Sequence, residues 1–298
     1  MSAPKQGFSI GPGQQPLSPQ GFVPASGKQA GPTVAEVHQS LQSYINHCER
    51  SLAAIQEQVW TLRRRNSALE AREKLRAQQR EPAMPIVFRS QYGEDVLLWD
   101  FLGQPTTGFF IEVGAFDGVS YSVSFALEAM GWKGLLIEAI PDRFAACMAA
   151  RPNSRVVHAA LNKPGSPPEA TFHFVQDQYG GMLSFLDPAS DHAKDMKSQG
   201  VQIQSVKVPQ KTMNELLADH TGPIDLAVID VEGGEVDLLK GFDLERYKPK
   251  VLCLEDMGGE GSPLCKYMET QSYTKAFWFE CNCIYVHNDA VGTVGRPV

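Results

Sequence analysis

The sequence predicts an α/β protein with a mainly parallel, Rossmann-like sheet, and three segments carry this prediction. Each is an apolar run, typical of a buried strand, that ends in acidic residues: Glu112-Val-Gly-Ala-Phe-Asp-Gly118, Leu136-Ile-Glu138 and Val228-Ile-Asp-Val-Glu-Gly-Gly-Glu235. Two of them add the glycines that a tight strand-to-helix turn needs. In an open α/β sheet the ligand binds outside the carboxyl ends of the strands, so these acids are expected to converge on one site.

Length and composition are those of a globular protein with flexible additions. The 298 residues, 43% hydrophobic and 20% charged, suffice for one large domain or two smaller ones. No apolar run reaches the length of a membrane helix and no signal segment opens the chain, so we expect a cytoplasmic protein. The six cysteines show no metal-ligand spacing and are expected to be free thiols, mostly buried.

Charge divides the chain into two parts. Residues 1–81 hold ten Lys and Arg against six Asp and Glu, whereas residues 82–298 hold seventeen against twenty-eight. An acidic catalytic domain repels a phosphate backbone, so a nucleic acid is a poor candidate substrate. The basic cluster Arg63-Arg64-Arg65 fits a solvated helix surface better than a contact with RNA or an anionic membrane.

The first 81 residues predict a disordered tail followed by a long helix. Residues 1–33 contain six glycines and six prolines and too few apolar side chains to order themselves. Residues 34–81 instead carry a heptad pattern. Its a positions are Ile45, Leu52, Val59 and Asn66, and its d positions are Leu41, Cys48, Ile55, Leu62 and Leu69.

This heptad predicts a parallel homodimer through residues 34–80. Largely β-branched residues at a favour two strands, and Asn66 at a single a position would fix the register. Arg65 of one helix could reach Glu70 of its partner. The alternative is a single amphipathic helix that lies on its own catalytic domain, and the partner of a coiled coil could also be another protein.

A single domain is predicted over residues 86–298. Beyond the prolines that end the helix, apolar strand patterns alternate with helical ones through residue 286, which indicates a mainly parallel sheet with right-handed crossovers. Residues 162–207 break this alternation and are rich in Gly, Ser and Asp, which is typical of a substrate loop.

The glycine turn after the first strand favours S-adenosylmethionine over a dinucleotide. Gly114 permits close approach to a ligand, and Gly118 opens a helix whose free N–H groups suit a methionine carboxylate. Glu112 or Asp117 could hold the ammonium group of that moiety. The fingerprint G-x-G-x-x-G of a dinucleotide site is absent, because Phe116 stands at its second glycine, although an NAD-linked oxidoreductase remains the alternative enzyme.

Two further strand ends supply the remaining candidate residues. Glu138, 26 positions after Glu112, is placed to accept hydrogen bonds from both ribose hydroxyls. Asp230 follows the strand that should face the methyl group of the donor, where a carboxylate can act as a general base or bind a divalent cation. Glu232 is a second candidate for either role, but it could equally cap the helix that begins near Gly234.

Taken together, these motifs resemble the FkbM-type S-adenosylmethionine-dependent methyltransferases over about residues 88–287. The matching segments are Ser90-Gln-Tyr-Gly-Glu-Asp95, Phe110–Gly118, Gly131–Glu138 and Ile229–Glu235. The resemblance implies the class I methyltransferase fold and O-methylation of hydroxyls on sugars or polyketides. It also implies a cofactor site that includes Gln91, Tyr92, Ala115 and Phe116.

The resulting hypothesis is an S-adenosylmethionine-dependent O-methyltransferase for a hydroxyl of a saccharide or related small molecule. Asp230 would assist deprotonation of the acceptor, and in-line positioning would dominate the rate. A non-enzymatic alternative is a methyltransferase-like scaffold assembled through its coiled coil. Two departures of this chain from the common family pattern hint at this alternative: Val228, where many members have Lys, and Phe116, where a smaller residue is usual.

Overall fold

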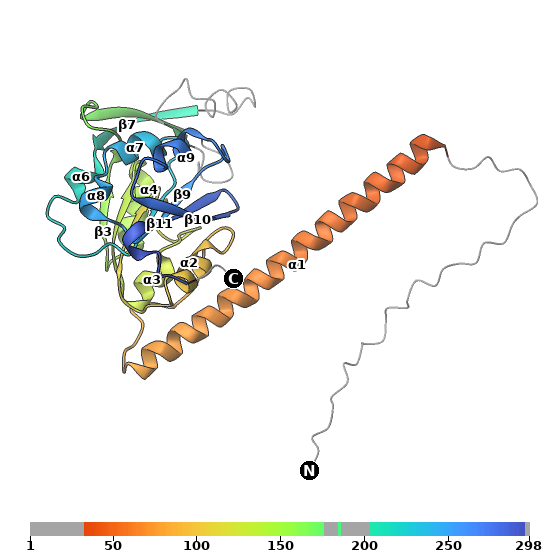
Figure 1. The fold of residues 1–298 in the computed structure, drawn as a ribbon, viewed down its shortest axis with the longest axis horizontal. Coiled ribbons are helices and arrows are strands. Elements are labelled where there is room, and N and C mark those ends of the chain that lie inside the picture. The colour runs from red at the N-terminus through yellow and green to blue at the C-terminus, as the bar shows by residue number, and fades with distance from the viewer. Residues whose placement is uncertain (1–32, 176–183, 186–202, 296–298) are drawn as a thin grey trace, which may run out of the picture. The chain divides into compact units, whose positions relative to one another are not determined.

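The computed structural model describes residues 33–175, 184–185 and 203–295. The chain divides after Ala54 into two units, Met1–Ala54 and Ile55–Val298. Helix α1 (Val34–Ala77), drawn in orange in Figure 1, runs through this division. The predicted disordered tail lies outside the described residues except for Thr33.

Helix α1 begins with a capping box. The Thr33 hydroxyl accepts a hydrogen bond from the Glu36 amide at 3.2 Å, and the Glu36 carboxylate accepts from the Thr33 amide at 2.7 Å. All residues from 33 to 59 are exposed, and burial starts at Trp60. Because Ile55–Val298 form one compact unit, packing of the domain begins well ahead of its predicted start at residue 86.

The face of α1 that packs on the domain is not the heptad face. Ser67, Ala71 and Leu75 are buried, whereas the apolar heptad side chains are between 47% and 65% exposed. These exposed side chains are Leu41, Ile45, Leu52, Ile55, Val59, Leu62 and Leu69.

Seven strands form the central sheet, in the order β3-β2-β1-β8-β9-β11-β10. Strand β11 runs antiparallel to both of its neighbours, and the other pairings are parallel. This arrangement confirms the predicted class I methyltransferase fold. The strands are β1 (Phe109–Val113), β2 (Lys133–Glu138), β3 (Arg155–His158), β8 (Leu226–Ile229), β9 (Val251–Glu255), β10 (Tyr273–Phe279) and β11 (Asn282–His287).

A separate hydrophobic core lies on each face of the sheet, because successive strand residues point to opposite faces. Phe110 and Leu136 belong to one core, and Ile111 and Leu135 to the other. The first core includes side chains of α1, α2 (Glu94–Phe101), α3 (Phe125–Met130) and α4 (Pro141–Ala150). The second includes α6 (Met213–Leu216), α7 (Glu235–Lys240), α8 (Leu244–Tyr247) and α9 (Pro263–Met268).

The region predicted as a substrate loop holds strands at both ends. Strands β4 (Ala160–Leu161), β7 (Ile203–Lys211), β5 (Glu169–Val175) and β6 (Ser184–Phe185) form a second sheet, in the order β4-β7-β5-β6. The polar stretch between β5 and β7 lies outside the described residues apart from β6. None of the described helices combines the length and apolarity that a bilayer crossing requires.

Candidate functional site

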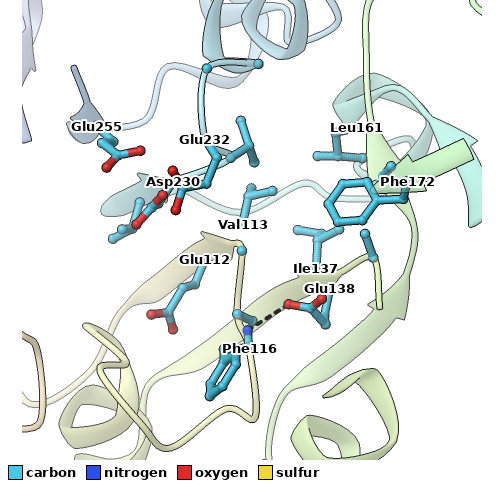
Figure 2. Close-up of a pocket in the computed structure, with 18 of the residues that line it drawn as sticks. Glu112, Val113, Phe116, Ile137, Glu138, Leu161, Phe172, Asp230, Glu232 and Glu255 are labelled. Carbon is cyan, nitrogen blue, oxygen red and sulfur yellow. Dashed lines mark hydrogen bonds between the residues drawn. The ribbon is translucent and has the colours of Figure 1, made fainter. Parts of the chain in front are cut away.

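A cavity of about 1360 Å³ lies at the carboxyl ends of β1, β2, β8 and β9, where the sequence places its ligand. It is large enough for a nucleoside-sized cofactor together with a second molecule. Figure 2 shows two ends of this cavity. Glu255, Asp230 and Glu232 gather at one end, and Glu138 lies at the other among Ile137, Leu161 and Phe172.

The glycine turn after β1 brings backbone atoms to the cavity. A side chain at Gly114, with φ at +82°, would have its Cβ 2.1 Å from the carbonyl oxygen of Asp230, so only glycine fits between the two strand ends. Phe116 also has a left-handed backbone, with φ at +52°. Its ring stacks under the Arg143 guanidinium, which lies 4.8 Å from the ring centroid. Gly114, Ala115 and Phe116 all line the cavity.

Glu138 ends β2 inside the cavity wall and is almost fully buried. Its carboxylate accepts hydrogen bonds from the amides of Phe116 and Ile140, each at 2.8 Å. Burial raises its pKa, while these two amides and Arg143 favour the ionised form. The two contacts fix the carboxylate at the strand end, and each oxygen retains a lone pair that can accept from a ligand.

Glu112, predicted to hold an ammonium group, lines the cavity and is also hydrogen-bonded within the protein. It accepts hydrogen bonds from the Ser122 hydroxyl at 2.9 Å, the Val123 amide at 2.8 Å and the Ser124 hydroxyl. The guanidinium of Arg151 lies 3.8 Å away. Although Glu112 borders the cavity, its carboxylate is 5% exposed and anchors the loop before α3.

Asp117 and Gly118, also predicted to bind the cofactor, do not line the cavity. The Asp117 carboxylate accepts from the amides of Val119 and Ser120, at 2.8 and 2.6 Å. The apolar pattern predicts a helix at about 120–130, and the structure shows it as α3, which begins only at Phe125. Gly118 packs against Cys147 and Arg151, where a Cβ would lie 2.9 Å from the Cys147 sulfur.

A pair of carboxyl groups shares a hydrogen bond at the other end of the cavity. Asp230 follows β8 and Glu255 ends the adjacent β9, and the side chains hydrogen-bond to each other. Loss of hydration and repulsion by Asp230 raise the pKa of Glu255 to about 10, because two neighbouring buried carboxyl groups cannot easily both be ionised. The side chain of Asp230 is open to the cavity, but many protein atoms surround it. The resulting loss of hydration raises the pKa of Asp230 as well.

Glu232 joins this pair from the turn after β8. Its backbone is left-handed, with φ at +56°, a strained conformation that is concentrated at functional sites. Burial, then repulsion by Asp230, raises the pKa of Glu232 to about 8. Glu232 does not cap α7, whose N-cap is Gly234 and which has no side-chain cap; Glu235, the first residue of α7, instead accepts hydrogen bonds from the amides of Val231 and Gly233 in the preceding turn.

The predicted cofactor residues Gln91 and Tyr92 also line the cavity, beside Glu94 at the start of α2. The Tyr92 amide donates to the Glu94 carboxylate at 2.9 Å. The loop is fixed by Asp95, which accepts hydrogen bonds from the amides of Arg89 and Ser90. The Ser-Gln-Tyr-Gly-Glu-Asp segment therefore builds part of the wall next to Asp230 and Glu255.

Sequence reasoning missed Glu255, although the sequence carries a signal for it. The strand Val251-Leu-Cys-Leu-Glu255 is an apolar run that ends in an acid, as in the three segments that were recognised. Phe172 and Arg143 were missed because they belong to the second sheet and to α4, which no strand-end pattern marks. Within the described residues no group of three or more His, Cys, Asp and Glu is arranged to hold a metal ion. All six cysteines are free, and four of them are buried.

Comparison with known proteins identifies one family. A model of the methyltransferase FkbM domain matches residues 112–274, which is more than half of the chain. No curated protein matches the sequence.

The fold resembles several solved methyltransferases of low sequence identity. The METTL16 methyltransferase domain is 14% identical, with 74% of this chain and 77% of that chain covered and a TM-score of 0.37. A TehB-like S-adenosylmethionine-dependent methyltransferase from Corynebacterium glutamicum is 12% identical (72% and 93% covered, TM-score 0.35). Precorrin-6y C5,15-methyltransferase from Geobacter metallireducens is also 12% identical (67% and 92% covered, TM-score 0.35).

Proposed function

Because the chain belongs to the FkbM methyltransferase family, we propose that it is an S-adenosylmethionine-dependent O-methyltransferase acting on a hydroxyl of a saccharide or related small molecule. The observation that carries this proposal is the gathering of Asp230, Glu232 and Glu255 at one end of the cavity, where β8 and β9 end. A carboxylate that lines the cavity among other acids is suited to take a proton from a hydroxyl.

The other end of the cavity fits the nucleoside part of S-adenosylmethionine. Glu138 would accept hydrogen bonds from ribose hydroxyls, and Ile137, Leu161 and Phe172 form apolar walls of the kind that an adenine ring packs against. The narrow passage at Gly114 would let the donor lie against the backbone between β1 and β8. When bound, the donor supplies an electrophilic methyl group on a sulfonium centre.

The charge of the lining favours a neutral or cationic acceptor. Among the described lining residues, Arg143 is the only Lys or Arg, and it lies over Phe116. The acids of the lining are Glu94, Glu112, Glu138, Glu169, Asp230, Glu232, Asp237 and Glu255. Such a lining repels phosphates and carboxylates, which supports a hydroxyl of a sugar over a nucleic acid or an anionic metabolite.

In this mechanism, the protein contributes positioning and proton transfer. Asp230 would accept the proton of the acceptor hydroxyl, and Glu255 would keep the Asp230 carboxylate oriented. Glu232, whose pKa is raised to about 8 by burial and by Asp230, is the second group that could accept this proton. A divalent cation bound by Asp230 or Glu232 is the alternative way to activate the hydroxyl.

Glu138→Ala is expected to weaken the binding of S-adenosylhomocysteine by ~1.5–3 kcal/mol, because hydrogen bonds to an ionised group are lost. Isothermal titration calorimetry of the folded variant measures the change. Asp142→Ala is the matched control, because Asp142 is exposed on the neighbouring α4 and does not line the cavity. Unchanged affinity in folded Glu138→Ala would remove Glu138 from the ribose site.

The proposed assembly is a parallel homodimer through the heptad face of α1. The exposed apolar stripe lies on a different face of the helix from Ser67, Ala71 and Leu75, which supports a second helix as the partner of that stripe. Arg65 is exposed beside the stripe, and Glu70 is held by hydrogen bonds from Asn66 at 2.6 Å and Gln104 at 3.1 Å. Arg65 of one copy and Glu70 of the other carry complementary charge across the proposed seam.

The double variant Ile45→Asp with Leu52→Asp is expected to be a monomer, because two carboxylates cannot be buried in the apolar seam. Both side chains are exposed, so the Ile55–Val298 unit should keep its melting temperature. Multi-angle light scattering gives the mass, with Ala53→Asp, which lies off the seam, as the control that should remain a dimer. A monomeric wild-type protein would contradict the dimer.

A further inference from the structure

Helix α1 reaches the wall of the cavity through two residues that the sequence motifs do not include. The Arg64 guanidinium donates to the carbonyl oxygens of Ser90 and Gln91, at 2.8 and 3.3 Å. These two carbonyls belong to the loop whose next residue, Tyr92, lines the cavity with Gln91. The side chain of Arg64 is 18% exposed, and its hydrogen bond to Ser90 is partly buried, whereas the one to Gln91 is exposed.

Trp60, one helical turn before Arg64, packs against the same loop. A Cβ at Gly93 would lie 2.3 Å from the Trp60 ring, so the indole occupies the space that any side chain at this position would need. Gly93 also has φ at +105°, a conformation that glycine alone adopts without strain. The indole and the loop are therefore fitted to each other.

Trp60 also contacts the hairpin that forms the adjacent part of the wall. Its ring meets Phe279 of β10 edge to face, with centroids 5.5 Å apart. Cys281 and Asn282, just beyond Phe279, line the cavity, and the Asn282 amide lies 3.4 Å from a carboxylate oxygen of Glu94. Asn282 pairs in register with Glu255. The Trp60 indole thus packs against both the Ser90–Gly93 loop and the β10–β11 hairpin.

From these contacts we propose that Trp60 and Arg64 are positioning residues for the cavity. They hold the Ser90–Gly93 loop in the conformation that binds the donor and the acceptor. Neither side chain lines the cavity, so both act through the loop. This proposal relies on the proposed function only for the choice of S-adenosylhomocysteine as the probe ligand. The N-terminal helix is on this account part of the enzyme and not only a dimerisation element.

Hydrogen exchange of the ligand-free protein tests the proposal without any assumption about the ligand. The amides of Ser90, Tyr92 and Gly93 donate to side chains within the loop and should exchange slowly. In Arg64→Ala we expect exchange across residues 90–95 to accelerate about tenfold, as loss of one charge-assisted hydrogen bond implies. Exchange in β1 and β8 should not change.

Binding of S-adenosylhomocysteine provides the second measurement. The dissociation constant should rise about tenfold in Arg64→Ala, for the same reason, and low concentrations of methylguanidine should restore part of the affinity. Arg64→Lys should lie between wild type and Arg64→Ala, because the ammonium keeps the charge but differs in reach and geometry from the single guanidinium nitrogen that donates to both carbonyls. Arg76→Ala, at an exposed position of the same helix, is the matched control.

The outcomes separate the two proposals. Wild-type protein that fails to bind S-adenosylhomocysteine would overturn the proposed function and leave the exchange result to decide this inference. If the wild type binds S-adenosylhomocysteine and Arg64→Ala changes neither hydrogen exchange nor affinity, the positioning role is overturned. If Arg64→Ala does not fold, Arg64→Lys and Trp60→Phe carry the test, since each preserves most of the packing at its position.

Discussion

Replacing Asp230 with asparagine is expected to lower turnover ~10²–10⁴-fold, the range for loss of a general base, while donor affinity changes only a few-fold. The amide keeps the size of the carboxylate but cannot accept the hydroxyl proton. Turnover is measured with radiolabelled S-adenosylmethionine and the acceptor that a screen of saccharides identifies, and donor affinity by calorimetry. Inhibition of the wild type by a chelator would change the role of Asp230 from base to metal ligand.

Glu255→Gln is the matched control for Asp230→Asn. A glutamine at position 255 keeps the size of the carboxyl group and can donate an N–H to Asp230, so most of the turnover should survive. The two isosteric changes on one hydrogen-bonded pair are therefore expected to differ greatly. Equal loss in both variants would show that the proton lies on Asp230, and full activity in Asp230→Asn would place the base elsewhere.

Arg151→Met is expected to lower the free energy of unfolding by ~3–5 kcal/mol, because it leaves a buried charge without its partner. Arg151 and Glu128 are both fully buried, with Nε and Oε2 2.8 Å apart. The guanidinium also donates to the Gly118 carbonyl at 3.0 Å and to the Ser124 hydroxyl at 2.8 Å. Urea denaturation followed by circular dichroism measures the change.

A second substitution separates the lost ion pair from lost packing. Adding Glu128→Leu to Arg151→Met removes the orphaned carboxylate and should recover much of the stability, since apolar replacement of a whole buried pair is often neutral. Full stability of Arg151→Met alone would contradict the account of this cluster, which also holds Glu112 and the loop before α3.

Most of the sheet could be predicted from the sequence because its strands are continuous apolar runs bounded by glycines and acids. The pattern predicts strands at 108–113, 134–138, 224–229 and 250–255 and a helix at 141–150. Strands β1, β2, β8 and β9 lie within two residues of these bounds, and helix α4 matches its predicted range. Helices α8 and α9 are too short to show a helical period, so the sequence did not reveal them. The long helix α1 was predicted, but only the heptad face was recognised.

The site was predicted at the level of strand ends and not at the level of single carboxylates. Asp230 and Glu138 face the cavity as expected, whereas Glu112 and Asp117 satisfy nearby backbone amides and hydroxyls. A sequence records that an acid follows a strand but not which donors lie within reach of it. Trp60 and Arg64 contact a loop that lies about 30 positions further along the chain. Neither residue breaks the heptad pattern of the helix, so the sequence carries no local sign of these contacts.

The central claim is that the cavity binds S-adenosylmethionine, and the most direct test is isothermal titration calorimetry of the wild-type protein with S-adenosylhomocysteine and with NAD. The account predicts saturable, one-to-one binding of S-adenosylhomocysteine and none of NAD. Binding of NAD alone would indicate the oxidoreductase, and binding of neither ligand by the folded protein would contradict the claim and favour a scaffold.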